Sequence, residues 1–133
     1  MISELTDKDC VALLGSTTVG RLGFVLAGRV LVIPVNYVLD GDDIVIRTAP
    51  DGLLSGLTTS RETVAFEVDH HDDLGGSGWS VLLNGPVTEM TAEEVDAVPG
   101  THRARPWAGG DRSLALRLHP EMMSGRRVQR DRR

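Results

Sequence analysis

The sequence of 133 residues contains one cysteine, Cys10, and one lysine, Lys8. A single thiol forms neither an intrachain disulfide nor a cysteine-based zinc site, so no oxidising compartment is indicated. The longest apolar run, residues 30–39, has about half the length of a membrane-spanning helix. The first residues also lack the basic and apolar regions of a secretory signal. We therefore expect a cytoplasmic protein with no membrane partner.

The common catalytic motifs are also missing. The sequence has no G-x-S-x-G motif, no phosphate-binding loop of the G-x-x-x-x-G-K-[ST] type, and no strand followed by G-x-G-x-x-G. Cys10 falls on the apolar side of a predicted first helix, where a buried and inert thiol is expected. We therefore do not expect covalent catalysis by the protein's own side chains.

The charge of −5 is unevenly distributed. Residues 126–133 carry five arginines and one aspartate, which leaves a net charge of −9 for residues 1–125. An acidic body repels nucleic acid, and a short basic terminus is typical of a solvated tail. We expect a single domain over residues 1–125, an Arg-rich tail over residues 126–133, and no nucleic-acid partner.

Alternating apolar residues predict six or seven short strands joined mostly by tight turns. Three short helices are expected at connections: one capped by Thr6 and ended by Gly15, one near residues 53–58, and one opened by Thr91. Residues 30–39 are apolar on both alternating faces, so this strand should be buried on both sides. Pro34 implies a bulge, an edge or an interruption within it. Gly85-Pro86 should bend the strand of residues 79–90.

A dense group of possible metal ligands occupies residues 69–73, with two histidines and three aspartates. Adjacent residues of an extended chain point to opposite sides, so His70 and His71 do not easily share one ion. Residues 70–78 are polar and rich in glycine, and they therefore predict a solvated loop without a metal.

Two polar features stand out near the middle of the chain. Asn36 interrupts an apolar strand and needs a hydrogen-bond partner, which could be a neighbouring bulge or a polar aromatic ligand. Arg47-Thr48 precedes a Pro/Gly turn and a short helix, a combination that suits a phosphate group. An arginine at the end of a strand is also commonly a solvated charge, so the residues alone leave both interpretations open.

The order and spacing of several short segments resemble the pyridoxamine 5′-phosphate oxidase-like, flavin-binding split-barrel proteins, in particular their short actinobacterial members. The segments that carry the resemblance are Val19-Gly20-Arg21-Leu22, Ile33-Pro34-Val35-Asn36-Tyr37, Ile46-Arg47-Thr48-Ala49-Pro50, Val64-Ala65-Phe66-Glu67-Val68-Asp69, Gly78-Trp79-Ser80-Val81 with Gly85, Arg105-Pro106-Trp107-Ala108, and Pro120 with Gly125-Arg126-Arg127-Val128. The resemblance implies a mainly β fold, a six-stranded antiparallel split β-barrel with short connecting helices. It also implies a homodimer with FMN or a deazaflavin coenzyme between the subunits.

By the family pattern, residues of two strands would flank the cofactor, namely Val35, Asn36 and Tyr37, and Arg47, Thr48 and Ala49. Trp79 and Trp107 would lie near the cleft, although a core or interface role is an equal alternative for each. Relatives usually carry a lysine for the cofactor phosphate where this chain has Leu53, and Arg61 or Arg47 is a possible substitute. The pattern predicts a flavin- or deazaflavin-dependent oxidoreductase acting on a small conjugated substrate. The alternative is a non-catalytic protein that binds a flavin, haem or another flat ligand.

Overall fold

The computed structural model describes residues 1–49, 52–60, 62–100 and 114–130. Strands dominate the described chain: β1 (Ile2–Glu4), β2 (Val19–Leu26), β3 (Arg29–Asp40), β4 (Asp43–Thr48), β5 (Val64–Asp72), β6 (Ser77–Gly85), β7 (Val87–Glu89), β8 (Leu114–Leu118) and β9 (Met122–Gln129). The short helices are α1 (Asp7–Leu14), the 3-10 helix η1 (Leu53–Gly56), α2 (Leu57–Ser60) and α3 (Ala92–Ala97). The expected mainly β fold with short connecting helices is confirmed.

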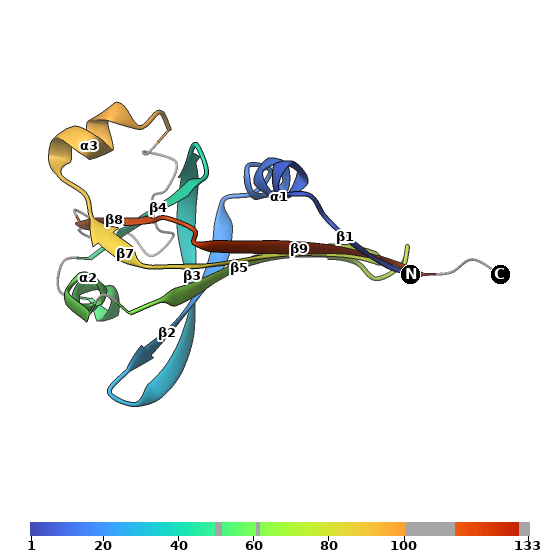
Figure 1. Ribbon diagram of the computed structural model, residues 1–133, viewed down its shortest axis with the longest axis horizontal. Helices are drawn as coiled ribbons and strands as arrows, with labels where there is room; N and C mark the ends of the chain where they lie inside the picture. The colour runs from blue at the N-terminus through green and yellow to red at the C-terminus, as the bar shows by residue number, and fades with distance from the viewer. Residues whose placement is uncertain (50–51, 61, 101–113, 131–133) are drawn as a thin grey trace.

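All strands belong to one antiparallel sheet in the order β1-β9-β6-β5-β2-β3-β4-β8-β7. β3 joins the two parts of this sheet, because its residues 29–36 pair with β2 and its residues 37–40 pair with β4. Figure 1 shows the larger part, β1, β9, β6 and β5, continuing through β2 and β3 into the smaller part, β4, β8 and β7. Among the described residues the sheet is open and has nine strands, in contrast to the six expected in a barrel.

The strand predicted for residues 79–90 is divided in two. β6 ends at Gly85 and β7 begins at Val87, so the bend expected at Gly85-Pro86 is confirmed. A Cβ atom on Gly85 would meet the carbonyl oxygen of His119, so this close approach requires glycine. Residues 79–90 therefore contribute to two strands with different partners: β6 pairs with β9, whereas β7 pairs with β8.

The prediction of a loop over residues 70–78 is wrong. His70 pairs with Trp79 and His71 with Gly78, so β5 and β6 form a hairpin whose connection is only residues 73–76. Gly76, at φ +66°, adopts the left-handed conformation that this tight turn needs. Polar residues continue the strand because this end of the hairpin is exposed to solvent.

Both predicted helix caps are confirmed. The Thr6 hydroxyl accepts a hydrogen bond from the Asp9 amide at 3.1 Å, and α1 ends at Gly15. Thr91 and Glu94 form the reciprocal pair of a capping box at the start of α3. No helix in the described part of the chain has the length and apolar character needed to cross a membrane.

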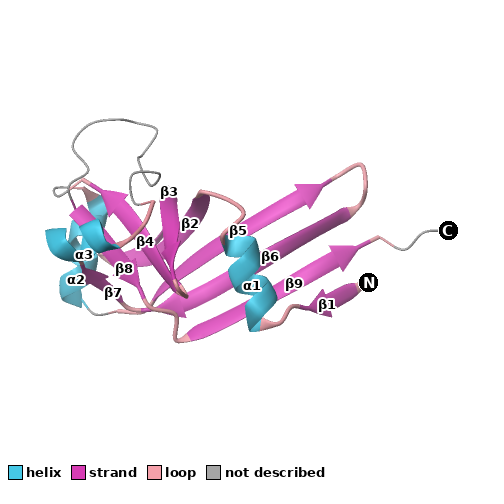
Figure 2. Cartoon of the chain, turned by 90° about the horizontal axis from the view of Figure 1, so that it is seen from above, coloured by secondary structure: helices cyan, strands magenta, loops and turns pink. Residues whose placement is uncertain are grey.

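Two apolar cores hold the sheet together. α1 lies over β5, β6 and β9 (Figure 2), and its residues Cys10 and Leu14 belong to the main core. The fully buried members of this core include Leu22, Tyr37, Ile44, Ile46, Phe66, Val81, Leu83, Leu116 and Leu118. A smaller core packs on the other side of β4 and β8 and contains Val45, Met90, Val98 and Ala115. Val95 of α3 also packs against this smaller core, so the helix covers it.

The first half of β3 is exposed, so the prediction that residues 30–39 are buried on both sides is wrong for this half. Val30 is 77% exposed and Val32 is 63% exposed. Pro34 lies in the section of β3 that pairs with β2 alone among the described strands, and the expected edge position is confirmed. The sequence pattern is apolar on both faces, but only one face meets the core.

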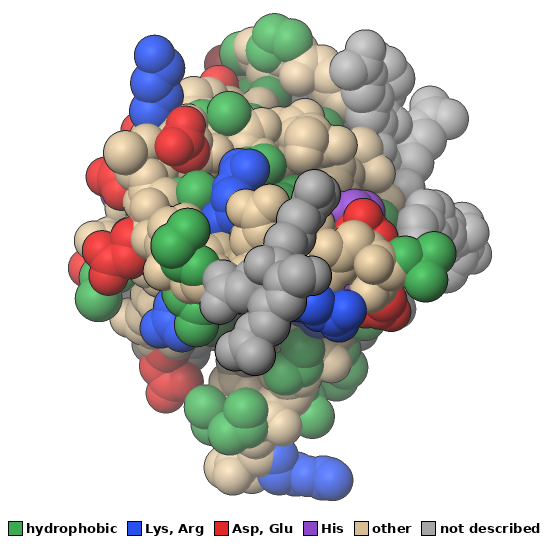
Figure 3. All heavy atoms as spheres, turned by 90° about the vertical axis from the view of Figure 1, so that its right-hand side faces the viewer, with side chains coloured by type: hydrophobic (Ala, Val, Ile, Leu, Met, Phe, Trp, Pro, Cys, Tyr) green, Lys and Arg blue, Asp and Glu red, His purple; other side chains and the backbone are tan. Residues whose placement is uncertain are grey.

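The exposed valines belong to an uncovered side of the larger sheet part, which we call the outer face. Figure 1 shows α1 on one side of β5, β6 and β9, and only the β2–β3 hairpin of the described chain projecting from the other. Strand register places seven of the eleven exposed large apolar residues on this outer face. They are Ile2, Val25, Val30, Val32, Leu82, Met122 and Val128. Figure 3 shows apolar side chains gathered on the projecting hairpin.

The arginines near the C-terminus lie partly within the sheet. β9 extends to Gln129 and pairs with both β1 and β6, so the expected domain boundary at residue 125 falls inside a strand. The next residue, Arg130, donates its backbone amide to the carbonyl oxygen of Gly76 at 2.7 Å.

Candidate functional site

Arg47 and Thr48 end β4, where they pair with Ala115 and Leu114 of β8. Arg47 is half-buried, and its Nε atom is buried without a hydrogen-bond partner in the described part of the chain. A buried donor that lacks a partner costs about 1–3 kcal/mol. An anionic oxygen placed beside Arg47 would satisfy this donor, so the residue fits a phosphate or carboxylate group.

Ala49 and Gly52 are joined by a backbone hydrogen bond beyond the end of β4. The carbonyl oxygen of Ala49 accepts a hydrogen bond from the Gly52 amide at 3.2 Å, and the Ser55 hydroxyl donates to the Gly52 carbonyl at 2.8 Å. Leu53 then starts η1 with 55% of its side chain exposed. Thr48 and Ala49 are half-buried. Arg61 lies outside the described residues.

The predicted β3 residues point in two directions. Val35 and Tyr37 belong to the main core, and Tyr37 is only 1% exposed. The Tyr37 hydroxyl donates to the Leu14 carbonyl oxygen at 2.6 Å, and its ring meets Phe66 edge-on with centroids 5.0 Å apart. Burial raises the pKa of Tyr37 well above its ordinary value. Only Asn36, which is half-buried, faces the outer side of this strand.

Trp79 lies on β6, in the other part of the sheet from Arg47. It is half-buried, packs against the main core, and tilts toward the ring of His70 with centroids 6.4 Å apart. The pocket that Trp79 lines contains no residue of β3 or β4. The described chain therefore does not bring Trp79 into one pocket with Arg47. Trp107 lies outside the described residues.

Two neighbouring hollows mark the outer face. One, of about 300 Å³, lies at the turn of the β5–β6 hairpin, and the other, of about 320 Å³, lies nearer the middle of the sheet. Ser80 and Arg126 line both, so the two hollows adjoin. Sequence reasoning missed these residues because Ser80 faces Arg126 only through the pairing of β6 with β9. Strands so distant in sequence give no local signal of their pairing.

A charged group lies beside these hollows on the same face. Arg21 Nη1 donates to Glu67 Oε1 at 2.9 Å and to Asp69 Oδ2 at 2.7 Å. Burial, together with the neighbouring Asp69, raises the pKa of Glu67. The hydrogen bond with Glu67 and the Arg21 guanidinium lower the pKa of Asp69, against the opposing effect of burial. Among the described residues, no group of three or more His, Cys, Asp or Glu could hold a metal ion.

The site therefore combines an antiparallel sheet, open in its described part and divided at β3, with a half-buried arginine at the end of β4. The family model for pyridoxamine 5′-phosphate oxidase matches residues 6–127. The chain therefore belongs to the pyridoxamine 5′-phosphate oxidase family, and the resemblance found in the sequence is confirmed.

Individual relatives extend over nearly the whole chain. An uncharacterised protein of Mycobacterium tuberculosis is 27% identical over 136 residues, which cover 99% of this chain and 89% of that protein. An FAD-binding protein from Mycobacterium smegmatis has 24% identity and a TM-score of 0.74, with 97% of this chain and 100% of that chain covered. An FAD-binding protein from Mesorhizobium loti has 21% identity and a TM-score of 0.77, covering 97% and 99%. At these identities the two structures show a shared fold.

Proposed function

We propose that this chain binds a flavin-type coenzyme, either FMN or a deazaflavin, and acts as an oxidoreductase on a small conjugated substrate. The observation that carries the proposal is the buried Nε of Arg47 at the end of β4, which has no hydrogen-bond partner among the described residues. Family membership and the FAD-binding names of two proteins of the same fold support it. A bound flavin would supply the hydride chemistry, which agrees with the absence of the common catalytic motifs from the sequence.

In this proposal the protein contributes binding and orientation. Arg47 would hold the phosphate of the cofactor through a charge-assisted hydrogen bond, with the backbone of Ala49 and Gly52 beside it. Asn36 offers an amide to the polar edge of the ring from the outer side of β3. Val35 and Tyr37 support that strand from the core, so their side chains act through packing.

We also propose that the working unit is a homodimer formed through the outer face. Seven exposed apolar residues share this face, and a monomer rarely leaves such a set uncovered. The face also carries Arg21 and Arg126 together with Glu4, Glu67 and Asp69, so both signs of charge are present. A surface that holds both signs is suited to contact a second copy of itself. A second subunit would add its own residues to a cleft that one chain leaves open.

Cofactor titration tests the binding proposal directly. The purified chain is titrated with FMN, FAD and the deazaflavin coenzyme, and quenching of cofactor fluorescence gives the Kd of each. Arg47→Gln should weaken the preferred cofactor at least about tenfold, because a charge-assisted phosphate contact is lost. Arg29→Gln, at the exposed tip of the β2–β3 hairpin, is the matched control and should leave the Kd unchanged. Equal weakening by both variants, or no binding of any of the three, would contradict the proposal.

A second candidate function is favoured by one residue. Leu53 is 55% exposed at the start of η1, where the family pattern places a phosphate-binding lysine. A site without that charge suits a protein that carries a flavin, haem or another flat ligand without turnover. The Leu53→Lys variant distinguishes the two candidate functions. If it gains FMN affinity but does not turn over a nitroaromatic acceptor, the non-catalytic binding function is supported. Turnover by the native chain at a rate above that of free reduced flavin supports the oxidoreductase.

A further inference from the structure

β6 lies between two flanks of the outer face. β9 and β1 continue the larger sheet part on one side of β6, and β5, β2 and β3 continue it on the other (Figure 2). We call these the β9 flank and the hairpin flank. Leu82, which is 40% exposed, is the large apolar residue of the outer face that belongs to β6 itself. The other six exposed apolar residues divide equally, with Ile2, Met122 and Val128 on the β9 flank and Val25, Val30 and Val32 on the hairpin flank. The apolar set is therefore balanced about β6.

The hairpin flank carries an excess negative charge. Arg21 Nη1 lies 2.9 Å from Glu67 Oε1 and 2.7 Å from Asp69 Oδ2, so two carboxylates share one guanidinium. With histidine counted as neutral, one cation and two anions leave this group with a net charge of −1. Burial and the neighbouring Asp69 raise the pKa of Glu67, although Arg21 opposes that shift. The charge of Glu67 is therefore incompletely balanced within one chain.

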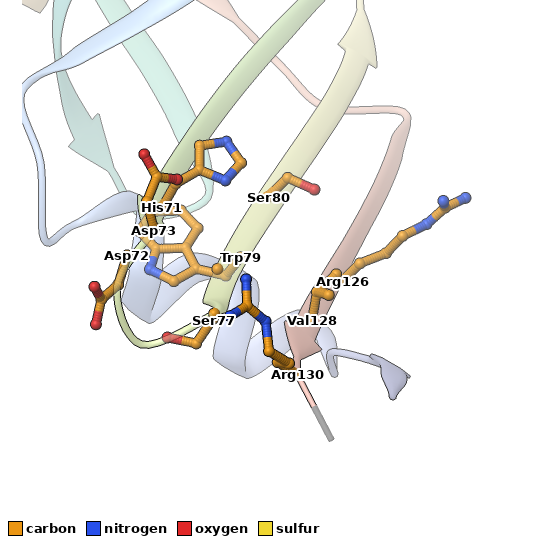
Figure 4. Close-up of a pocket in the computed structure, with 11 residues that line it drawn as sticks. His71, Asp72, Asp73, Ser77, Trp79, Ser80, Arg126, Val128 and Arg130 are labelled. Atoms are coloured by element: carbon orange, nitrogen blue, oxygen red, sulfur yellow. The ribbon is translucent and has the colours of Figure 1, made fainter. Parts of the chain in front are cut away.

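The β9 flank carries an excess positive charge. Arg126 is the register partner of Glu4 in β1, and Arg130 follows directly after β9 on the same side as Arg126. Two cations and one anion leave a net charge of +1. Neither arginine forms an ion pair with a side chain in the described part of the chain. Figure 4 shows Arg126 extended outward from β9, away from the other labelled side chains, so it can reach a carboxylate of another molecule.

Glu67 and Arg126 line the same hollow of the outer face. It measures about 320 Å³, and its other lining residues are Ser80, Leu82, Ser124 and Gly125. Strand register places every side chain of this lining on the outer face. Within one chain β6 separates the two charged residues, since they come from β5 and β9. A second copy seated over this hollow would bring a new charged partner to each of them.

A second copy that is rotated about β6 satisfies the apolar pattern and the charge pattern together. In a two-fold contact, if residue i of one subunit meets residue j of the other, residue j of the first also meets residue i of the second. An axis that runs along β6, in the plane of the contact, places the β9 flank of each copy over the hairpin flank of the other. Three exposed apolar residues then cover three, and the positive flank lies over the negative one. An axis that runs across the strands would instead place each flank over its own copy, so that like charges meet.

We propose that the two-fold axis of the dimer runs along β6, with Arg126 of each copy paired to Glu67 of the partner subunit. This inference rests on the proposed dimer and specifies its geometry. Leu82 lies at the axis, against Leu82 of the partner subunit. The added guanidinium serves the two carboxylates that share Arg21, so the contact buries neither of them with an unbalanced charge. The outer face therefore selects a second copy in one orientation.

Charge reversal tests the pairing. Arg126→Glu and Glu67→Lys each replace two attractive contacts of the dimer with two repulsive ones. Each variant alone should therefore raise the dimer Kd at least about tenfold in analytical ultracentrifugation. An equimolar mixture of the two variants should recover a dimer Kd within about threefold of the native value, because one contact of the mixed dimer is native and the other joins the two reversed charges.

Arg127→Glu is the matched control, because Arg127 alternates to the opposite side of β9. It should leave the dimer Kd unchanged, and it should not rescue Glu67→Lys in a mixture. A native dimer whose variants dimerise normally, or whose mixture stays monomeric, would overturn the placement of the axis and leave the dimer itself intact. A native protein that is monomeric throughout would refute the dimer and this inference with it.

Cross-linking tests the same axis without reversing a charge. Leu82→Cys lies at the proposed axis, so a short bis-maleimide reagent should join two copies of this variant, while the buried Cys10 stays out of its reach. Val30→Cys is the control, because Val30 is 77% exposed and lies three strands from β6. Two copies of it should stay unlinked, since the axis holds them on opposite flanks. Failure of Leu82→Cys to link, or linkage of Val30→Cys in its place, would overturn the proposal.

Discussion

The Tyr37 hydroxyl donates a hydrogen bond to the last residue of α1, Leu14. The last carbonyl groups of a helix have no partner within the helix, and the Leu14 carbonyl is satisfied by Tyr37 in the core. Tyr37→Phe leaves that buried carbonyl unpaired, so we expect the free energy of unfolding to fall by about 1–3 kcal/mol. Urea denaturation followed by circular dichroism measures the change. A loss within experimental error would show that the carbonyl finds another donor.

Asp69 should make stability depend on pH. The hydrogen bond with Glu67 and the Arg21 guanidinium lower its pKa in the folded state below the ordinary value of 3.8. The folded protein then binds this proton more weakly than the unfolded chain, so the stabilisation is present above pH 3.8 and is lost as the pH falls through the lowered pKa. Asp69→Asn should therefore destabilise the protein at neutral pH and progressively less below pH 4.

Denaturation of native protein and Asp69→Asn between pH 7 and pH 3 measures this difference. Asp73→Asn is the control, because Asp73 lies in the exposed hairpin turn and the ion pairs of Arg21 are with Glu67 and Asp69. A constant difference between native protein and Asp69→Asn over the whole range would contradict the assignment.

At the scale of elements, β2 approaches the core through Gly20. A Cβ atom at this position would lie 2.7 Å from Phe66 Cε2, so Gly20→Ala must displace a fully buried ring. We expect a loss of about 1–3 kcal/mol in the free energy of unfolding. In Gly23→Ala the new Cβ atom would lie at an ordinary 3.6 Å from the Ala65 Cβ, and the smaller entropy of the unfolded chain should stabilise the protein by about 0.4–1 kcal/mol.

Thermal unfolding of the two alanine variants and of the native protein measures the change in Tm for each. A similar Tm for Gly20→Ala and Gly23→Ala would mean that Phe66 moves at little cost.

The local signals in the sequence were reliable guides to elements. Thr6 and Thr91 identified the starts of two helices, and Gly85-Pro86 identified the break between β6 and β7, because caps and bends depend on neighbouring residues. The exposure of Val30 and Val32 could not be predicted in this way. Their pattern matches a doubly buried strand, and only the order of the sheet shows that one face is uncovered.

The candidate site was predictable to a similar extent. Arg47-Thr48 is predictable because a guanidinium and a hydroxyl precede a Pro/Gly turn signal in the sequence. The structure adds that the Arg47 Nε is buried and has no partner in the part of the chain that it describes. The hollow at the turn of the β5–β6 hairpin is not predictable. Its residues come from strands whose pairing is non-local, and the polar end of β5 has the sequence pattern of a loop.

At the scale of the whole molecule, the outer face should decide the oligomeric state. Val32 is 63% exposed within the shared apolar set, and a buried charge at a subunit contact without a partner is strongly unfavourable. Val32→Asp should therefore shift the protein from dimer to monomer in analytical ultracentrifugation, or raise the dimer Kd at least about tenfold.

Leu74→Asp is the control for the dimer, because Leu74 is 98% exposed but lies in the hairpin turn outside the apolar set. It should leave the sedimentation coefficient unchanged. A native protein that sediments as a monomer at all concentrations would refute the proposed dimer.

β3 runs through both parts of the sheet, and this continuity affects how the protein unfolds. Its residues 29–36 hold β2 and its residues 37–40 hold β4, so no loop separates the two parts. Either part can come apart alone only by breaking the ladder along this one strand. We therefore expect a single cooperative unfolding unit. Amides of β4 and of β5 should exchange with solvent deuterium at the same slow rate, limited by global unfolding, even though they lie in different parts of the sheet.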